Sequence, residues 1–532
     1  MNEPEYNLLD EKWIRVLNDD GTLTDVSLLE VFERAHLYRR LANETETVDI
    51  AILRLLLAIL YAVFSSVDAD GNSDPLTDNN ALSRWQTLWE RKTLPYAQIE
   101  EYLECFRERF YLFHPKTPFY QAADLATRKC TEYRTPKLIG DISQSGNKVR
   151  LFFSRTNSDH IGYPEAARWL LHLNAFDDTS AKPSVRGGGM ESPGAGWLGK
   201  LGLLFSEGKN LFETLLLNFV LLNSDRQIFE RGNPVWEIEA VCTGERVRIV
   251  QPSSLAELYT LQSRRLLLIR ENDAIVGYKL LGGDFFDKEN ASVEQMTLWR
   301  RDPKTENLTP MRHRPSRQLW RDFSALVASR DGDKPPGIVH WHEVLVNKKI
   351  IGDTQVKFSG PSLGYGDKDF FVDDMFSDSV SINSYMLSDL GAEWRRRITE
   401  NLEFTDKAVQ AFGRFALDLA LAEGADNEKG NIARIRSAAR EEAYEELDVP
   451  FRDWLAGRTV DEDMEAALSL WKEIVKHTLV KSANIRLNDA SDAAIIGREV
   501  KNAGFVTASK AEIYFRASLK KNLYECKEGG KS

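Results

Sequence analysis

Cysteine is scarce in this sequence, and no two cysteines form a close CxxC pair. The 532 residues include only Cys105, Cys130, Cys242 and Cys526. A disulfide-stapled domain needs denser cysteine spacing. A structural zinc site needs four suitably spaced cysteine or histidine ligands. We therefore expect reduced cysteines, no metal site and no bound cofactor.

Positive charge is also in deficit, because the formal net charge is -12. Stand-alone DNA-binding domains usually carry a basic excess. Salt screens charges beyond about 10 Å, so local basic patches can still contact nucleic acid on an acidic chain. This balance argues against non-specific coating of DNA. It permits local contact by a subunit that its partners hold in place.

Long hydrophobic runs are missing as well. The most apolar stretch, Ile50 to Phe64, carries Arg54 and is shorter than the roughly 20 residues that span a bilayer. The polar, acidic start of the chain lacks the basic and apolar regions of a secretory signal. We expect a buried helix, no membrane partner and a cytoplasmic protein.

The residue patterns change near residue 385. Before it, a turn at Asn18 to Gly21 predicts a hairpin, and short helical and strand-like runs alternate. After it, apolar residues at three- and four-residue spacing predict four amphipathic helices. These helices lie near 389–422, 430–455, 461–480 and 508–523. We predict an α+β fold with a large mixed α/β N-terminal domain, residues 1–384, and a C-terminal four-helix bundle, residues 385–532.

Two segments are locally basic. Residues 128–155 carry seven positive and two negative side chains and lack helical periodicity, and residues 300–321 are similarly rich in arginine. Long irregular segments in large domains are usually functional or disordered. A nucleic-acid contact and a solvated loop both fit this composition.

A glycine-rich loop at residues 181–202 suggests a nucleotide site. Gly194, Gly196 and Gly199 fit a dinucleotide fingerprint, and Gly194 to Lys200 fits most of a P-loop. However, Leu201 replaces the Ser or Thr that would hold magnesium, and the preceding residues do not predict a strand. A nucleotide-binding enzyme that uses residues 187–200 is therefore the alternative hypothesis, and not the favoured one.

Positive signs of catalysis are absent from the sequence. It contains no Ser/His/Asp arrangement, no HExxH, no nuclease signature and no helicase motif, so we expect a protein that is not an enzyme. The pair His340 and His342 would share one face of a strand, where a structural role is expected, since two ligands do not make a metal site.

Several segments, in order along almost the whole chain, resemble the CasA family, the large subunit of the type I-E CRISPR surveillance complex called Cascade. Each is a loose pattern, and their ordered co-occurrence is the specific signal. The matching segments are Asn7 to His36, Asp49 to Leu60, Phe110 to Gln121, the glycine loop, Lys288 to Asp302, and Ala439 to Gly457.

This resemblance implies a role in RNA-guided DNA recognition. A CRISPR RNA pairs with target DNA, while protein reads a short adjacent motif, the PAM. The family approaches the PAM of foreign double-stranded DNA through the minor groove and helps open the duplex. The implied partners are the CRISPR RNA, target double-stranded DNA, the backbone, 5′-end-binding and small Cascade subunits, and the helicase–nuclease that the family helps recruit. A free-standing helical scaffold is a third hypothesis.

The resemblance also implies positions for the PAM-reading residues. The glycine loop falls on Gly187, Gly188 and Gly189, where absent side chains let the backbone approach a groove closely. Composition alone favours a flexible turn as the explanation of these glycines. The groove-reading lysine finger falls on Lys288, with Asn290 as the alternative.

The strand-separating wedge of the family falls on Asp367, Lys368 and Asp369. Here the sequence departs from the family, because Lys368 stands where a glutamine is typical. A lysine is a point charge and not a planar amide, so wedge insertion is in doubt, and an ordinary acidic hairpin tip is the alternative.

The basic segment at 128–155 matches the family's loop that contacts the 5′ end of the guide RNA and the PAM region. Aromatic rings in such loops stack on bases, although core packing accounts for the same residues. Some family members carry CxxC zinc pairs, and this chain does not. The candidates are Lys137, Lys148, Arg150, Phe152, Phe153 and Arg155.

Overall fold

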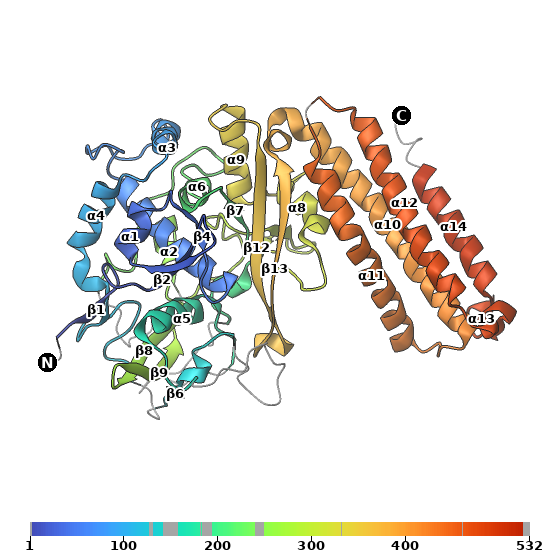
Figure 1. Ribbon diagram of the computed structural model, residues 1–532, viewed down its shortest axis with the longest axis horizontal. Coiled ribbons are helices and arrows are strands. Elements are labelled where there is room, and N and C mark those ends of the chain that lie inside the picture. Colours follow the sequence, from blue (N-terminus) through green and yellow to red (C-terminus); the bar gives the residue numbers. More distant parts are fainter. Residues whose placement is uncertain are drawn as a thin grey trace. The chain divides into compact units, whose positions relative to one another are not determined.

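A computed structural model describes residues 3–126, 131–141, 158–180, 182, 194–239, 249–330, 332–459 and 461–524. The chain divides into two compact units (Figure 1). Unit 1 comprises Met1–Pro315, Asp333–Ile350 and Val356–Ser379. Unit 2 comprises Ser316–Gly332, Ile351–Gln355 and Val380–Ser532.

Unit 1 begins with the predicted hairpin. Strands β2 (Ile14–Asn18) and β3 (Leu23–Val26) pair antiparallel, and Gly21 in the turn has a φ of 83°. Strand β4 (Tyr38–Leu41) extends this sheet along β2. Helix α1 (Leu28–Glu33) follows β3, and the Ser27 side chain caps it by accepting from the Glu30 N–H.

Helix α2 (Glu46–Phe64) is the central helix of unit 1 and confirms the expected buried helix. Its length and apolarity alone would allow it to cross a membrane, but 83% of its most apolar window is buried inside the protein. The charged side chain of Arg54, in the middle of α2, forms a buried ion pair at 2.9 Å with Glu294. Both features mark the core helix of a folded unit.

The other helices of unit 1 are short. Helix α6 ends at Leu217, and the side-chain amide of the next residue, Asn218, donates to the carbonyls of Ser206 and Thr214. The remaining helices of this unit are α3 (Ala81–Glu90), α4 (Tyr96–Cys105), α5 (Tyr163–Phe176), α6 (Leu211–Leu217), α7 (Leu255–Tyr259) and α9 (Gly337–Asn347).

His340 and His342 lie on helix α9, so the expected strand is wrong at this point. The His342 ring is fully buried, packs edge-on against Phe358, and has no hydrogen-bond partner among the described residues. Burial lowers its pKa to about 3. The structural role expected for this histidine is consistent with these surroundings.

Two three-stranded sheets carry the loops of interest. One has the order β6-β9-β8, and the other β13-β12-β7. Two-stranded pairs join β1 with β5 and β10 with β11. The strands are β1 (Glu5–Asn7), β5 (Tyr111–Phe113), β6 (Tyr133–Arg134), β7 (Phe205–Glu207), β8 (Arg264–Glu271), β9 (Ala274–Gly282), β10 (Trp299–Arg301), β11 (Leu308–Pro310), β12 (Gln355–Tyr365) and β13 (Val372–Asn383).

Unit 2 contains the predicted bundle of four long helices (Figure 1). Between α12 and α14 lie α13 and the antiparallel pair β14 and β15. Helix α12 runs beyond its expected end because Ser482 and Ala483 are still buried. The elements are α10 (Ala392–Glu423), α11 (Lys429–Ala456), α12 (Met464–Asn488), α13 (Asp492–Ile496), β14 (Arg498–Val500), β15 (Gly504–Val506) and α14 (Ala508–Tyr524).

Residues 316–332 also belong to unit 2, although they precede it in the sequence. They include α8 (Phe323–Val327). The Trp320 ring stacks on Phe451 at 4.5 Å between centroids, and its indole N–H donates to Asp448 at 2.7 Å. The fold is therefore α+β, with a mixed N-terminal region and a C-terminal four-helix bundle, as predicted.

Candidate nucleic-acid interface

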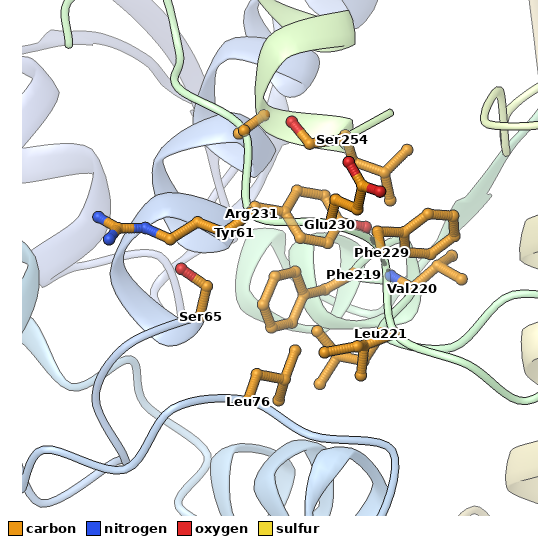
Figure 2. Close-up of a pocket in the computed structure, with 14 residues that line it drawn as sticks. Tyr61, Ser65, Leu76, Phe219, Val220, Leu221, Phe229, Glu230, Arg231 and Ser254 are labelled. Carbon is orange, nitrogen blue, oxygen red and sulfur yellow. Dashed lines mark hydrogen bonds between the residues drawn. The ribbon is translucent and has the colours of Figure 1, made fainter. Parts of the chain in front are cut away.

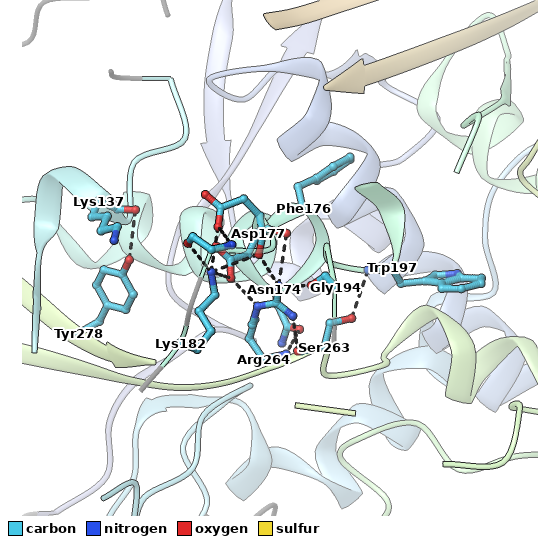
Figure 3. Close-up of polar contacts among 12 residues, drawn as sticks. Lys137, Asn174, Phe176, Asp177, Lys182, Gly194, Trp197, Ser263, Arg264 and Tyr278 are labelled. Atoms are coloured by element: carbon cyan, nitrogen blue, oxygen red, sulfur yellow. Dashed lines mark hydrogen bonds and ion pairs between the residues drawn. The ribbon is translucent and has the colours of Figure 1, made fainter. Parts of the chain in front are cut away.

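The segment that leaves helix α5, residues 176–182, organises the candidate site (Figure 3). The buried Asp177 carboxylate pairs with Lys182 at 2.9 Å and with the guanidinium of Arg264. The same guanidinium donates to the carbonyls of Asp178, at 2.8 Å, and Gly194, at 2.7 Å. Burial alone would raise the pKa of Asp177, but these two cations hold it below its usual value. Arg264 thus ties the chain just before the glycine-rich loop, and Gly194 within it, to β8.

The described glycines of that loop are used for close packing. A side chain on Gly196 would overlap the backbone of Ala175, and one on Gly199 would overlap the Tyr365 ring. The Gly196 N–H donates to the Asp177 carbonyl at 2.8 Å. Gly194 adopts a φ of +74°. Contacts within unit 1 therefore account for these three glycines.

The nucleotide-binding alternative also needs a helix that follows the loop, because phosphates bind at a helix N-terminus. Residues Leu198–Lys200 form only a short 3₁₀ turn, and Leu201 after it is extended. The described part of the loop therefore forms neither a P-loop nor a dinucleotide site. Gly187, Gly188 and Gly189 lie outside the described residues.

Lys200 marks a cluster of cations at the end of this loop. Its pKa is lowered to about 8, first by burial and then by the positive charges of Arg264, Lys288 and Arg312, while Asp287 acts in the opposite direction. These four cations come from separate segments of the chain, and two of them are ion-paired, Arg264 with Asp177 and Arg312 with Asp369. The resemblance suggested only Lys288 of these four, and Arg312 belongs to the second basic run.

The two candidates for the lysine finger differ in their surroundings. Asn290 has a φ of +54°, its N–H donates to the Leu308 carbonyl at 2.7 Å, and its side-chain oxygen accepts from the Leu308 N–H at 3.1 Å. The Asn290 side chain is thus engaged in folding its own segment against β11. Lys288 is exposed at the start of the same segment.

Residues Asp367–Asp369 form the tip of the hairpin between β12 and β13. Lys368 and Asp369 both adopt left-handed backbone angles, with φ of 54° and 59°, which are costly for residues other than glycine. Thr179 supports this shape: its N–H donates to the Asp369 carbonyl at 2.9 Å and its hydroxyl donates to the Lys368 carbonyl at 2.7 Å. The Lys368 side chain is exposed. The side chain of Asp367 lies outside the described residues.

Arg312 holds the side chain of the same tip. Its guanidinium contacts both Asp369 carboxylate oxygens at 2.9 Å and lies over the Tyr365 ring. The Tyr365 hydroxyl donates to the Phe176 carbonyl at 2.5 Å. The hairpin tip is therefore fixed to the residue 176–182 segment through both its backbone and its side chains.

A buried acid links the lysine-bearing segment to the glycine-rich loop. The Glu294 carboxylate accepts two hydrogen bonds from Arg54 of α2, each 2.9 Å, and one from the Trp197 indole at 2.8 Å. Glu294 and Arg54 are both almost completely buried. Sequence reasoning missed this acid, because it is one of many and its partners lie 97 and 240 residues away.

Lys137 is the one described residue among the candidates for the guide-RNA loop. It ends the 3₁₀ turn Thr135–Lys137, its carbonyl accepts from the Tyr278 hydroxyl at 3.2 Å, and its ammonium lies 4.5 Å from the Tyr133 ring centroid (Figure 3). This turn is thereby anchored on β9. The other candidates, Lys148, Arg150, Phe152, Phe153 and Arg155, lie outside the described residues.

One cavity of unit 1 shares no lining residue with this cluster. This cavity, of about 70 Å³, is lined mainly by apolar side chains such as Tyr61 and Phe219, with Glu230 and Arg231 among its polar residues (Figure 2). A cavity of this size could hold a water molecule or two, and not a nucleotide. Among the described residues, no group of three potential metal ligands is found.

Comparisons with known proteins agree with one another. A family model described as CRISPR-associated protein Cse1 matches residues 7–481. The chain is 28% identical over 489 residues to the CRISPR-associated protein CasA/Cse1 of Thermus thermophilus, covering 89% of this chain and 90% of that protein. Its structure is similar to that of Thermobifida fusca Cse1, with a TM-score of 0.82, 31% identity and 98% coverage of each chain. A chain of a CRISPR RNA-guided surveillance complex shares the fold, with a TM-score of 0.69, 17% identity and coverage of 97% and 100%.

Proposed function

Because this chain belongs to the CRISPR-associated Cse1 (CasA) family, the large subunits of Cascade, we propose that it recognises the PAM of foreign double-stranded DNA through the minor groove. It does so within a type I-E complex in which the CRISPR RNA reads the rest of the target. The protein acts by binding, without catalysis of its own. It works in the cytoplasm.

One observation carries this proposal. The positive charges of Lys288, Arg264 and Arg312 all act on the buried Lys200, and Thr179 and Arg312 hold the hairpin tip that bears Lys368. These residues come from separate segments of the chain. A groove about 6 Å wide admits backbone and single side chains, and Arg and Lys side chains are the usual contacts there.

Duplex opening follows from the same arrangement. The tip that bears Lys368 is preorganised, since Thr179 fixes its backbone. A rigid tip can enter between base pairs without first being ordered, which lowers the entropic cost of insertion. Lys368 then contacts a phosphate or a base edge, where the family typically inserts a glutamine.

The remaining roles rest on the family resemblance. The mixed domain up to residue 384 supplies the PAM-reading loops and contacts the guide RNA near Lys137. The bundle from residue 385 contacts neighbouring Cascade subunits. Together they help recruit the helicase–nuclease that degrades the target.

The proposal is tested by substituting Gly188 with leucine in the assembled complex. A side chain there blocks the close approach of backbone to groove, so affinity for PAM-bearing duplex falls at least about tenfold, or 1.4 kcal/mol. Affinity for duplex without a PAM changes little. Both are measured at one fixed salt concentration, because salt alone changes such affinities strongly.

Gly430 provides the matched control, since it has open space around its Cα in the structure. Gly430→Leu should leave the PAM preference unchanged. Equal affinities for the wild type and Gly188→Leu would refute the glycine-loop assignment. Stoichiometric binding of ATP or NAD by the purified chain would instead support the nucleotide-enzyme alternative.

A further inference from the structure

The ion pair between Arg312 and Asp369 stands out at the hairpin tip. A single guanidinium nitrogen contacts both carboxylate oxygens at 2.9 Å. The two side chains are 33% and 32% exposed, so solvent and ligands can reach the pair. An accessible arginine whose acceptor is an anionic group is a potential site for another anion.

The surroundings of Arg312 favour an anion. Its positive charge acts on Lys200 together with those of Arg264 and Lys288. The buried Asp177 is already paired with Arg264 and Lys182. Because Arg312 also lies over the Tyr365 ring, its guanidinium is held in place without needing Asp369 for its orientation.

We propose that Arg312 is a binding site for a backbone phosphodiester of duplex DNA, and that the Asp369 carboxylate occupies this site when no DNA is bound. This inference rests on the proposed function. It adds the backbone phosphodiester as the ligand of Arg312, and the Asp369 carboxylate as its competitor at the same site. Carboxylate and phosphate groups both accept hydrogen bonds from the guanidinium fork, so one can replace the other.

The exchange requires only a side-chain movement. Thr179 binds the main-chain carbonyls of Lys368 and Asp369, and not the Asp369 carboxylate. The carboxylate can therefore rotate away while the tip keeps its backbone shape.

Such a competitor has a physical consequence for selectivity. Any duplex that reaches the site must displace Asp369, so weak, non-specific complexes lose affinity. A duplex held by groove contacts elsewhere retains enough binding energy to make the exchange. The acid that flanks Lys368 thus acts as a filter against unselected DNA.

The test measures how affinity depends on salt in the assembled complex. Each phosphate neutralised adds about 0.9 to the slope of log affinity against log salt concentration. Asp369→Asn frees Arg312, and asparagine tolerates the left-handed backbone of this position. With duplex that lacks a PAM, which is held too weakly to displace Asp369 in the wild type, we expect the slope to steepen by about 0.9 and the affinity to rise roughly tenfold at low salt.

Three further variants make the result specific. Arg312→Gln added to Asp369→Asn should return the slope to the wild-type value, whereas Arg312→Lys keeps the charge and should retain most of the steepening. Asp373→Asn removes an acid from strand β13 of the same hairpin and leaves the Arg312–Asp369 pair in place. It should change the slope by much less than Asp369→Asn.

Equal slopes for Asp369→Asn and Asp373→Asn would show an effect of net charge alone and overturn the inference. So would a slope that does not respond to Arg312→Gln in the Asp369→Asn background. Failure of the proposed function would give a different result. In that case Gly188→Leu would not change the ratio of the affinities for duplex with and without a PAM, whatever the salt slopes of the Asp369 variants.

Discussion

The two units of this protein are stabilised by different kinds of interaction. In unit 1, buried arginines bind acids far away in sequence: Arg54 with Glu294, Arg168 with Glu44, and Arg264 with Asp177. In unit 2, the helices pack through aromatic rings such as Phe412, Phe415 and Phe515, and through Trp454 with Trp471. The ion pairs between its helical residues lie mostly at the surface.

This difference follows from what each unit contains. Long helices satisfy their own backbone hydrogen bonds and need only an apolar stripe to associate. The irregular loops of unit 1 cannot satisfy their backbone groups internally, and directional side-chain contacts fix them instead. Loops that present groups to a ligand depend on such anchors, and four predictions test the contrast.

The largest effect is expected from Glu294→Ala. It leaves the Arg54 charge buried without its partner and removes the acceptor of the Trp197 indole, so unit 1 should lose about 3–5 kcal/mol of unfolding free energy. Denaturant titration combined with hydrogen exchange of α2 measures this loss. Glu512→Ala, which breaks an exposed pair with Arg516 in unit 2, is the control. A loss below about 1 kcal/mol for Glu294→Ala would contradict the role assigned to the buried pair.

The bundle should respond instead to the loss of apolar volume. Leu479 of α12 is fully buried, and Leu479→Ala should cost about 3 kcal/mol, with faster hydrogen exchange confined to unit 2. Leu470, on the same helix, is 53% exposed, and its replacement by alanine should stay within about 0.5 kcal/mol. Similar losses at both positions would mean that packing does not dominate this unit.

Acid should weaken unit 1 through His342. Burial holds its pKa at about 3, below the 6.5 of an unfolded chain, so below pH 6.5 only the unfolded state takes up the proton. Stability should therefore fall with decreasing pH, by about 1.4 kcal/mol per pH unit for this residue, until the folded-state pKa is reached. His342→Leu should reduce the slope by that amount between pH 5.5 and 4.

A surface histidine of unit 2, His477, supplies the comparison for this pH effect. His477→Gln should leave the slope for unit 1 unchanged. Urea denaturation at several pH values, followed by hydrogen exchange in α9, gives both slopes. An unchanged slope in His342→Leu would rule out His342 as the source of the acid sensitivity.

The smallest effect is expected at exposed ion pairs. Arg396 contacts Glu393 and Glu400 on one face of α10, and the three side chains are about half exposed. Arg396→Gln should cost about 0.5 kcal/mol or less, and the cost should shrink further in high salt. Denaturation at low and high salt checks this. A loss comparable to that of Glu294→Ala would remove the contrast between the units.

Local patterns predicted the elements that depend on neighbouring residues. The turn at Gly21, the apolar run of α2 and the stripes of the four bundle helices all appear as predicted. The misses arise where distant contacts decide. Helix α9 was expected as a strand, because its short apolar run fits the repeat of a strand as well as that of a helix. Trp320 packs on Phe451, more than a hundred residues later, and no local signal marks that contact.

The candidate site divides in the same way. The family resemblance pointed to Lys288 and to the tip at Lys368, and composition pointed to the basic run that includes Arg312. Neither the resemblance nor the composition pointed to Thr179, Arg264 or Glu294, which hold these groups in position. Nothing in a sequence distinguishes a structural threonine or acid from the many others until its partner is known.

The sequence by itself determined the acidic balance, the α+β class and the bundle, because these depend on composition and on periodicity over a few turns. It indicated the family through the order of the segments that resemble it. Only the tertiary structure decided that the acid beside Lys368 is bound by Arg312, and that the glycines before Lys200 pack against α5 and Tyr365. The physical reason is that each of these contacts joins residues that the folded chain brings together from far apart, where local pattern carries no information.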